Sequence, residues 1–483
     1  MSFKFYGFLL LQLFMLISAF DLDDKRKSKL EEIIKSQMKN ANLHTMGIVI
    51  INETDTIFQN IFGEDAKANN QTRFTIGSVS KSFTALSVLK LNISLNQTLD
   101  KFDLGDYLDE DLLKEITISE LLNHTSGLAS FDSSNLTTRG TFKYSNYGFG
   151  LLGKIIEKVS NKKYSEYLKE EIFVPLNMTN TRAEYDDSVI ESYDNFLGSM
   201  TKFTSGESEA NENKGFYIPA GYISTSIEDM GNYLRFYLNQ SNADYVSNMT
   251  ACGVETGDNQ CYGMGMYINY GTNKTIYYHL GGATSFASKL VIIPQLNLSY
   301  FLVINTNDLL CLEPLFQFCA AIENFLLYDV YDEVDTTLHF YTHFTLDLIY
   351  FFIIAIPITY LVITVVRKVK RKKYTWFIDV KGKIIFGVDV FVLCILPIII
   401  LICCYGIDGD ISHLCTYIKD LLFTIITVCV ALWLNFIIKI VYMILYIKLK
   451  WEPTETKVEN KLNSSLQELT IKEDNEIDND NDS

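Results

Sequence analysis

A serine and a lysine three positions apart are the residues best suited to chemistry. Ser78 and Lys81 lie in the run Phe74-Thr-Ile-Gly-Ser-Val-Ser-Lys-Ser-Phe-Thr-Ala85. On a helix that begins at Ser78, both side chains share one face, and the hydroxyl lies at the positive end of the helix. A serine is a weak nucleophile until a nearby base takes its proton, and a partly desolvated lysine can hold that proton. The pair predicts acyl transfer on Ser78, although a capping serine beside a surface lysine gives the same pattern.

A second motif, Tyr144-Ser145-Asn146, supplies a candidate general base. A phenolate beside an ammonium group has a lowered pKa and can accept a proton. Asn146 can bind a substrate amide or accept a hydrogen bond from Lys81. An aromatic turn without catalytic meaning is the alternative interpretation of this motif.

A third motif, His279-Leu280-Gly281-Gly282, ends a predicted strand. Glycines at this point let a substrate carbonyl approach the backbone. The backbone N–H groups of Gly282 and Ser78 could then form an oxyanion hole. His279 has no evident partner ligands, so we expect neither a metal site nor a cofactor.

The elements around these motifs predict an α+β (α/β) domain with two subregions. Helical spacing covers 27–40, 78–91, 119–123, 149–160 and 312–329, and strand patterns cover 46–51, 56–61, 276–278, 289–293 and 300–305. The order is strands, a helical insertion, then strands and a closing helix. We assign this domain to residues 20–330.

Hydrophobic residues make up 48% of the 483-residue chain and gather in its C-terminal third, which predicts a membrane region. The predicted parts are a signal peptide over 1–19, a linker over 331–345, a membrane region over 346–450 with helices at about 346–366, 384–405 and 421–438, and an acidic disordered tail over 451–483. An uncleaved anchor is the alternative for the first segment. The basic loop 367–373 belongs on the cytoplasmic side, which places the catalytic domain outside or in a lumen and the tail in the cytoplasm.

The net charge, the cysteines and the glycosylation sequons limit the expected partners and covalent modifications. A net charge of −17 argues against general affinity for nucleic acid, whereas a membrane and a small-molecule or peptide substrate remain expected. The cysteines suggest two sequence-local disulfides, Cys252–Cys261 and Cys311–Cys319, although connectivity does not follow from sequence. Candidate glycosylation sequons begin at Asn52, Asn70, Asn92, Asn96, Asn135, Asn239, Asn248, Asn273 and Asn297.

Taken together, the motifs make the chain resemble the serine β-lactamase-like family, which includes class C β-lactamases, D-Ala-D-Ala peptidases and related esterases. Connecting segments similar to that family lie at Ile116–Leu128, Tyr144–Gly153, Pro175–Thr181, Pro219–Thr225 and Tyr262–Gly265. The resemblance covers about residues 25–330 and is of the eukaryotic type, here with C-terminal membrane spans. It implies a β-lactamase/transpeptidase-like fold, with an antiparallel sheet flanked by helices.

The resemblance also implies residue roles. Ser78 would be the acylated nucleophile, and Lys81 with Tyr144 would move the proton. Asn146 would position the substrate, and His279, Gly281 and Gly282 would form the third element. His279 and Leu280 stand where β-lactamases and transpeptidases usually carry Lys and Thr, which bind the substrate carboxylate. This departure argues against penicillins and D-Ala-D-Ala peptides as substrates.

Three hypotheses for function follow. The first is a membrane-anchored serine hydrolase of the secretory pathway, of esterase, amidase or peptidase type. The second is a catalytically silent binding or receptor-like domain on the same fold. The third is a true β-lactamase or D-Ala-D-Ala peptidase. The intact nucleophile and bases favour the first.

Overall fold

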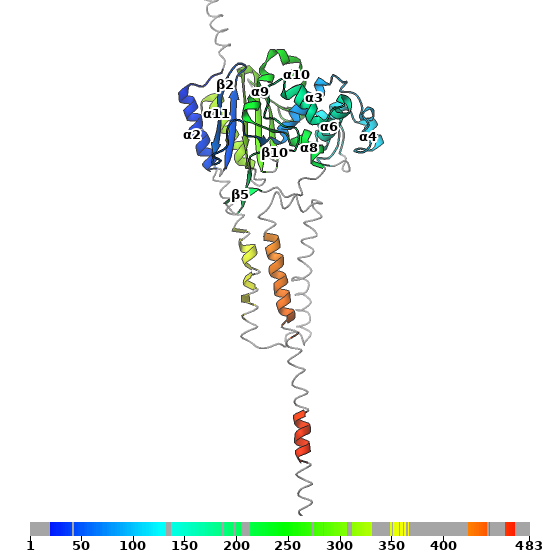
Figure 1. The fold of residues 1–483 in the computed structure, drawn as a ribbon, viewed down its shortest axis with the longest axis vertical. Helices are drawn as coiled ribbons and strands as arrows, with labels where there is room; N and C mark the ends of the chain where they lie inside the picture. Colours follow the sequence, from blue (N-terminus) through cyan, green and yellow to red (C-terminus); the bar gives the residue numbers. More distant parts are fainter. Residues whose placement is uncertain are drawn as a thin grey trace, which may run out of the picture. The chain divides into compact units, whose positions relative to one another are not determined.

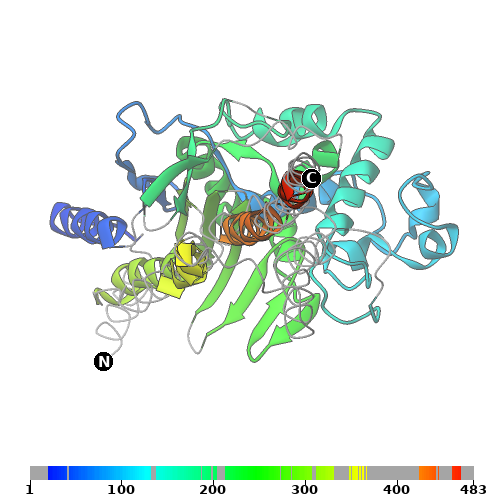
Figure 2. The ribbon, with the colours of Figure 1, turned by 90° about the horizontal axis from the view of Figure 1, so that it is seen from below.

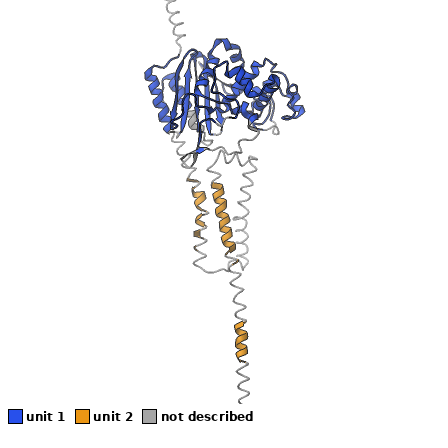
Figure 3. Ribbon diagram, in the orientation of Figure 1, with its two compact units in different colours: residues 1–343 blue, residues 344–483 orange. Residues whose placement is uncertain are grey.

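A computed structural model gives the fold. It describes residues 20–40, 43–131, 137–185, 188–196, 199–203, 213–271, 274–283, 285–306, 312–330, parts of 348–366, and 424–441, 444 and 459–468. The chain divides into two compact units, Met1–His343 and Phe344–Ser483 (Figure 3). The first unit contains all three motifs.

An eight-stranded sheet forms the centre of the first unit, in the order β2-β1-β12-β11-β10-β9-β8-β7. Every pairing in it is antiparallel, and the register aligns His279 with Leu290 and Met46 with Ile304. The strands are β1 (Thr45–Ile51), β2 (Thr56–Gly63), β7 (Val254–Gly257), β8 (Gln260–Tyr262), β9 (Tyr267–Tyr270), β10 (Thr275–Ala283), β11 (Phe286–Ile293) and β12 (Leu298–Ile304). β1 and β12 are buried along their whole length because both faces of the sheet are covered.

Helices α2 (Asp24–Asn40) and α11 (Leu312–Tyr328) cover one face of the sheet (Figure 1). They form one core with alternate residues of the strands, among them Ile48, Val291 and Leu302. Because side chains alternate along a strand, Val49, Leu290 and Val303 point to the other face.

The other face carries the helical subregion (Figures 1 and 2). Its α-helices are α3 (Ser80–Lys90), α4 (Glu110–Glu115), α5 (Ile118–Leu122), α6 (Asn146–Ser160), α7 (Tyr164–Leu168), α8 (Asn213–Gly221), α9 (Ile227–Leu238) and α10 (Ala243–Met249). Short 3-10 turns lie at Gly77–Val79, Leu99–Lys101, Gln240–Asn242 and Pro294–Leu296, and a π-helical turn at Lys169–Phe173. Helix α3 is buried from Ser80 to Val88, so it forms the centre of this second core.

Two small antiparallel pairs complete the domain: β3 (Phe74–Thr75) with β6 (Ser224–Thr225), and β4 (Ser192–Phe196) with β5 (Ser199–Phe203). The first pair joins the segment before Ser78 to the segment after α8. It therefore fixes the start of α3 against the helical subregion.

The predicted α+β domain is confirmed, with an antiparallel sheet and helices on both faces. The expected helices and strands all form, with ends that differ by a few residues. The sequence prediction missed the helices α4, α7, α8, α9 and α10, the short strands β3 to β6 and the edge strands β7 to β9. The edge strands are three or four residues long, too short for a clear alternating pattern.

The structure describes only part of the predicted membrane region. Thr424–Val441 overlaps the third predicted span, about 421–438, and is long and apolar enough to cross a membrane by length and composition. A shorter apolar helix, Phe351–Tyr360, falls in the first span. The signal peptide, the linker 331–345 and the span 384–405 lie outside the described residues.

Residues 459–468 form a helix where the sequence predicts a disordered tail. All its side chains are exposed, and its only large apolar residues are Leu462 and Leu466. Their spacing of four places them on one face, which the composition-based prediction overlooked.

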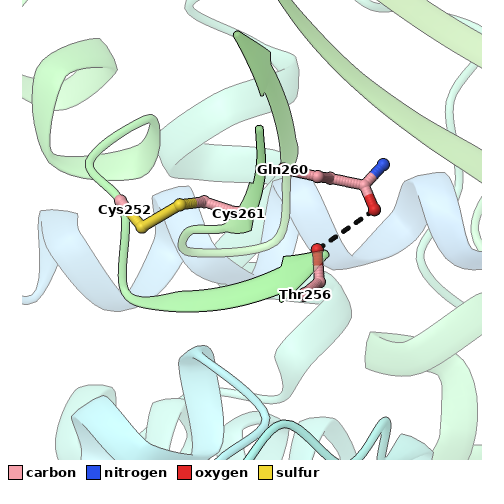
Figure 4. Close-up of a disulfide and its surroundings, with 4 residues drawn as sticks. All are labelled: Cys252, Thr256, Gln260 and Cys261. Carbon is pink, nitrogen blue, oxygen red and sulfur yellow. Dashed lines mark hydrogen bonds between the residues drawn. A yellow bond between two sulfur atoms is a disulfide. The ribbon is translucent and has the colours of Figure 1, made fainter. Parts of the chain in front are cut away.

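One of the two predicted disulfides is present. Cys252 and Cys261 are bonded, with Cα atoms 5.4 Å apart, and join the start of β7 to β8 (Figure 4). The prediction of Cys311–Cys319 is wrong: Cys319 is a free thiol on α11, buried in the core against the sheet. Cys311 lies outside the described residues.

The glycosylation candidates differ in exposure. Asn52 is only 4% exposed and its amide donates to the carbonyl of Phe20, so this sequon is not accessible in the folded domain. The turn at 52–55 uses the Asn52 side-chain oxygen as its acceptor, which explains the burial. Asn297 is half-buried, Asn135 and Asn273 lie outside the described residues, and the exposed candidates are Asn70, Asn92, Asn96, Asn239 and Asn248.

Candidate active site

Ser78 lies on a sharp turn between β3 and α3, where a 3-10 turn over Gly77–Val79 precedes the helix. Gly77 has a φ of +54°, and a Cβ there would lie 2.4 Å from the backbone nitrogen of Gly282. Only glycine permits both the conformation and this approach. The backbone of the turn thus lies directly against the third motif, with Ser78 half-buried beside it.

Lys81, one turn further along α3, is completely buried and contacts three polar atoms. Its Nζ lies 3.0 Å from Ser78 Oγ, 2.7 Å from Asn146 Oδ1 and 2.6 Å from the carbonyl oxygen of Ala220. Both the amide oxygen and the carbonyl oxygen can only accept hydrogen bonds.

Burial lowers the pKa of Lys81 well below its usual value. Among the described residues, no carboxylate is near enough to offset that loss of hydration. A neutral amine has two N–H donors and one lone pair. Its donors match Asn146 and Ala220, which leaves the lone pair for the hydroxyl proton of Ser78. The geometry therefore suits a general base.

Tyr144 is not the phenolate that the sequence predicts. Burial raises its pKa well above the ordinary value, and a hydrogen bond with Ser78 opposes the shift without cancelling it. Lys81 Nζ lies 4.7 Å from the ring centroid of Tyr144. The expectation of a lowered pKa assumed an ammonium neighbour in a wet site, whereas burial here disfavours both charges. Tyr144 is thus a neutral phenol that can pass a proton on.

The ring of Tyr144 packs against the ring of His124, a residue that the sequence prediction did not single out. The two ring centroids are 4.4 Å apart. The backbone N–H of Ser145 donates to His124 Nδ1 at 3.1 Å, and Ser145 Oγ caps α6 by accepting from the N–H of Gly148. His124 therefore fixes the segment that delivers Tyr144 and begins α6.

Asn146 is the first residue of α6, and its amide is oriented by contacts at both ends. Its oxygen accepts from Lys81, and its Nδ2 lies 3.4 Å from Ser130 Oγ. This is the second of the two roles that the sequence predicts for Asn146. Ala220, at the end of α8, was also missed; the signal that could have found it is the family-like segment Pro219–Thr225.

The third motif lies at the end of β10 against the catalytic turn. A Cβ at Gly281 would lie 2.1 Å from the carbonyl oxygen of Ile76, so this position has no room for a side chain. Ser288, paired with Gly281 across β10 and β11, donates to the same carbonyl at 2.8 Å. The strands thus hold the turn that carries Ser78 beside Gly282, as an oxyanion hole requires.

His279 is buried and both of its ring nitrogens are occupied. Nδ1 donates to the carbonyl of Leu280 at 2.7 Å, so Nε2 carries no hydrogen and accepts from the hydroxyl of Tyr262 at 3.1 Å. Burial lowers the pKa of His279 to about 3, and Lys81 adds to the effect. His279 is therefore neutral at physiological pH.

Leu280 does not face Ser78 and Lys81. It pairs with Lys289, whose side chain reaches Glu323 on α11, across the sheet from Ser78. The missing hydroxyl at this position is thus a weaker argument against carboxylate binding than the sequence suggested. The neutrality of His279 carries that argument instead.

The structure brings all seven predicted site residues to one junction between the sheet and the helical subregion. Ser78 comes from the 3-10 turn before α3, and Lys81 from α3 itself. Tyr144 lies just before α6 and Asn146 begins it, and the other three, His279, Gly281 and Gly282, come from β10. A sheet with a helical subregion on one face and a serine–lysine pair at their junction is an arrangement in which a serine hydroxyl can be activated for attack on a carbonyl.

The comparison with protein families gives the identity of the domain. The family model described as Beta-lactamase matches residues 30–310, and the chain belongs to that family. Members of this family are often serine hydrolases.

Curated relatives are distant. "Protein flp" of Staphylococcus aureus (strain COL) is 24% identical over 327 residues, which cover 59% of this chain and 64% of that protein. "Beta-lactamase-like protein 2" of Dictyostelium discoideum is 26% identical over 260 residues, which cover 45% of this chain and 46% of that protein. The match thus spans less than two thirds of the length of either relative.

Solved structures support the fold. The structure of the octameric penicillin-binding protein homologue from Pyrococcus abyssi aligns with a TM-score of 0.54 and 24% identity. The alignment covers 62% of this chain and 77% of that one.

Proposed function

We propose that this chain is a serine hydrolase that works through an acyl-enzyme on Ser78. The observation that carries the proposal is the environment of Lys81 Nζ, which lies 3.0 Å from Ser78 Oγ and is buried without a carboxylate partner among the described residues. A buried amine with two acceptors and a serine hydroxyl around it is a base prepared for that hydroxyl. Packing alone would not require a lysine here.

The proposed reaction has two halves. Ser78 Oγ attacks the substrate carbonyl carbon as its proton moves to Lys81 Nζ, and the N–H groups of Ser78 and Gly282 stabilise the oxyanion. The proton then passes through the phenol of Tyr144 to the leaving group, and the bond to that group breaks. In the second half, water attacks the acyl carbon and gives its proton to the same pair. The bond from the acyl carbon to Ser78 Oγ then breaks, the pair returns that proton to Oγ, and the acid is released.

We infer that the preferred substrates are short esters or neutral amides. A substrate carboxylate beside the third motif would meet the neutral imidazole of His279, whose nitrogens are both engaged. An unpaired carboxylate in a partly dry pocket costs several kcal/mol, on the order of 2–7 kcal/mol for a polar group without a hydrogen bond. Penicillins and D-Ala-D-Ala peptides carry such a carboxylate.

Parallel assays on the purified chain test the substrate class. We expect turnover of p-nitrophenyl acetate that disappears in Ser78→Ala, with much slower turnover of benzylpenicillin. A matched control is Ser87→Ala, which removes another buried hydroxyl from α3, one that donates to the carbonyl of Phe83. Efficient penicillin hydrolysis without esterase activity would refute the neutral-substrate proposal.

We also propose that the chain is a multi-pass membrane protein of the secretory pathway, with its catalytic domain outside or in a lumen. Thr424–Val441 is long and apolar enough for one span. The loop 367–373 is rich in lysine and arginine, and such loops lie on the cytoplasmic side of membranes. The membrane region would then act as an anchor for the hydrolase.

A further inference from the structure

A second polar pocket lies on the face of the sheet opposite Ser78. It has a volume of about 260 Å³, just below the range of about 300–1,000 Å³ typical of drug-sized ligands. It is lined by Asn269 of β9, Ile276, Tyr278 and Leu280 of β10, Lys289 of β11 and Glu323 of α11. The proposed hydrolase mechanism uses none of these side chains.

An ion pair forms the charged part of the pocket. Lys289 Nζ lies 2.5 Å from Glu323 Oε1, and the two side chains are 13% and 20% exposed. Tyr300 also donates to Glu323 Oε1. The second carboxylate oxygen, Oε2, has no partner among the described residues.

The remaining polar groups of the pocket also have unused hydrogen-bonding capacity. Tyr278 accepts a hydrogen bond from Gln260 at 2.5 Å, which leaves its own hydroxyl hydrogen free to donate. Among the described residues, Lys289 Nζ donates a hydrogen bond to Glu323 alone, and it lies 5.8 Å from the ring centroid of Tyr278. The side-chain amide of Asn269 has no partner among the described residues. The pocket thus offers one carboxylate acceptor and several donors side by side.

This arrangement selects a dipolar ligand. A lone anion attracted to Lys289 would be repelled by Glu323. A lone cation attracted to Glu323 would be repelled by Lys289. A zwitterion can place its ammonium group on Glu323 Oε2 and its carboxylate on Lys289 and Tyr278, which satisfies both charges at once. Ile276 and Leu280 also line the pocket and supply an apolar surface for a short side chain.

The strands under the pocket also hold the catalytic turn. Leu280 lies between His279 and Gly281, and Lys289 follows Ser288, whose hydroxyl binds the carbonyl of Ile76 two residues before Ser78. We propose that the pocket is an effector site for a small zwitterion of the α-amino-acid class, and that its occupancy changes the rate of acylation at Ser78. The binding itself is independent of the proposed function, whereas the rate effect rests on it.

Calorimetry on the detergent-solubilised full chain carrying Ser78→Ala tests the binding. We expect L-alanine to bind saturably and at least tenfold more tightly than acetate or methylamine. Glu323→Gln should weaken L-alanine at least tenfold and improve acetate, because Lys289 is then no longer neutralised. Lys289→Met should instead improve methylamine, and the control Glu157→Gln, which alters an ion pair on α6, should change nothing.

Other results would overturn the binding site or the effector role. Absence of L-alanine binding, or unchanged selectivity in Glu323→Gln, would overturn the site. In the chain that retains Ser78, saturating L-alanine should change the rate at which a fluorophosphonate probe labels Ser78 at least twofold. An unchanged labelling rate would overturn the effector role. If the phosphonate probe does not label Ser78 even without L-alanine, the proposed hydrolase function fails. The calorimetry still tests whether the pocket binds L-alanine.

Discussion

The chemistry proposed for the site depends on one buried residue, Lys81, whose Nζ lies 3.0 Å from Ser78 Oγ. Residue type and spacing placed Lys81 within reach of Ser78, because positions three apart share a helix face. The neutral state of Tyr144 depends on burial by segments distant in the chain. His124 and Tyr262 were missed for the same reason: only the folded structure brings them behind Tyr144 and His279.

The pH dependence of acylation tests the role of Lys81. Because burial lowers the pKa of Lys81 well below 10.5, we expect the labelling rate to reach its plateau well below pH 10.5, with no titration of an ordinary lysine at the alkaline end. Lys81→Met should lower the plateau by roughly 10²–10⁴-fold, the usual contribution of a general base. Labelling reactions quenched at fixed times from pH 5 to 10 measure the pH profile and the loss in Lys81→Met. A rate that climbs steadily to pH 10 would argue against the neutral amine.

The same shift predicts a pH effect on stability. Between the lowered pKa in the folded chain and 10.5 in the unfolded chain, only the unfolded chain binds the proton, so the free energy of unfolding rises with pH across this window. Thermal melts should show that this rise is smaller in Lys81→Met. The exposed control Lys114→Met should keep the full rise.

At the scale of elements, β8 positions β10 through one hydrogen bond. Tyr262 donates to His279 Nε2, and a hydrogen bond to the neutral form of a histidine holds its pKa down. We expect Tyr262→Phe to raise the pKa of His279 from about 3 and to improve turnover of anionic substrates near pH 5. The imidazole titration followed by NMR measures the shift.

Tyr267→Phe is the matched control for this prediction. The Tyr267 ring also lies near His279, at 5.5 Å between centroids, but its hydroxyl makes no hydrogen bond with the described residues. Equal pKa values of His279 in Tyr262→Phe and in the unmodified chain would remove Tyr262 from the positioning role.

The disulfide at the edge of the sheet stabilises the hairpin that carries Tyr262. Cys252 and Cys261 close a short loop, and Gly253 beside the bond packs against Asn123, next to His124. Replacing both cysteines with serine should lower the unfolding free energy by about 2–3 kcal/mol. Thermal melts with and without reductant measure the loss, and an equal melting temperature for both forms would contradict it.

At the scale of the whole molecule, the sequence predicts the division into a hydrolase domain and a membrane region. Long apolar runs and a basic loop require no knowledge of tertiary contacts, so these features are readable from composition alone. The short strands β7 to β9 and the pairing of Cys319 depend on tertiary packing and were missed or mistaken. The buried Asn52 shows the same limit for a sequence motif.

Topology is the prediction that belongs to this scale. Residues 20–345 should be glycosylated and open to protease on intact cells or sealed vesicles oriented alike, and an epitope after Ser483 should be accessible only after permeabilisation. Exposed sequons such as Asn70 and Asn96 should carry glycans, whereas Asn52 should not. Glycosidase treatment and mass spectrometry read the sites. Detection of the C-terminal epitope on intact cells would reverse the orientation.

Covalent labelling of Ser78 tests the central claim most directly. A fluorophosphonate probe on the purified full chain should modify one serine, identified by peptide mass spectrometry as Ser78. Ser78→Ala should abolish the signal and leave the melting temperature nearly unchanged, because Ser78 lies in the turn before α3 and does not cap that helix. Ser87→Ala should label normally. Labelling that persists in folded Ser78→Ala, or an absence of labelling in the unmodified chain, would contradict the account.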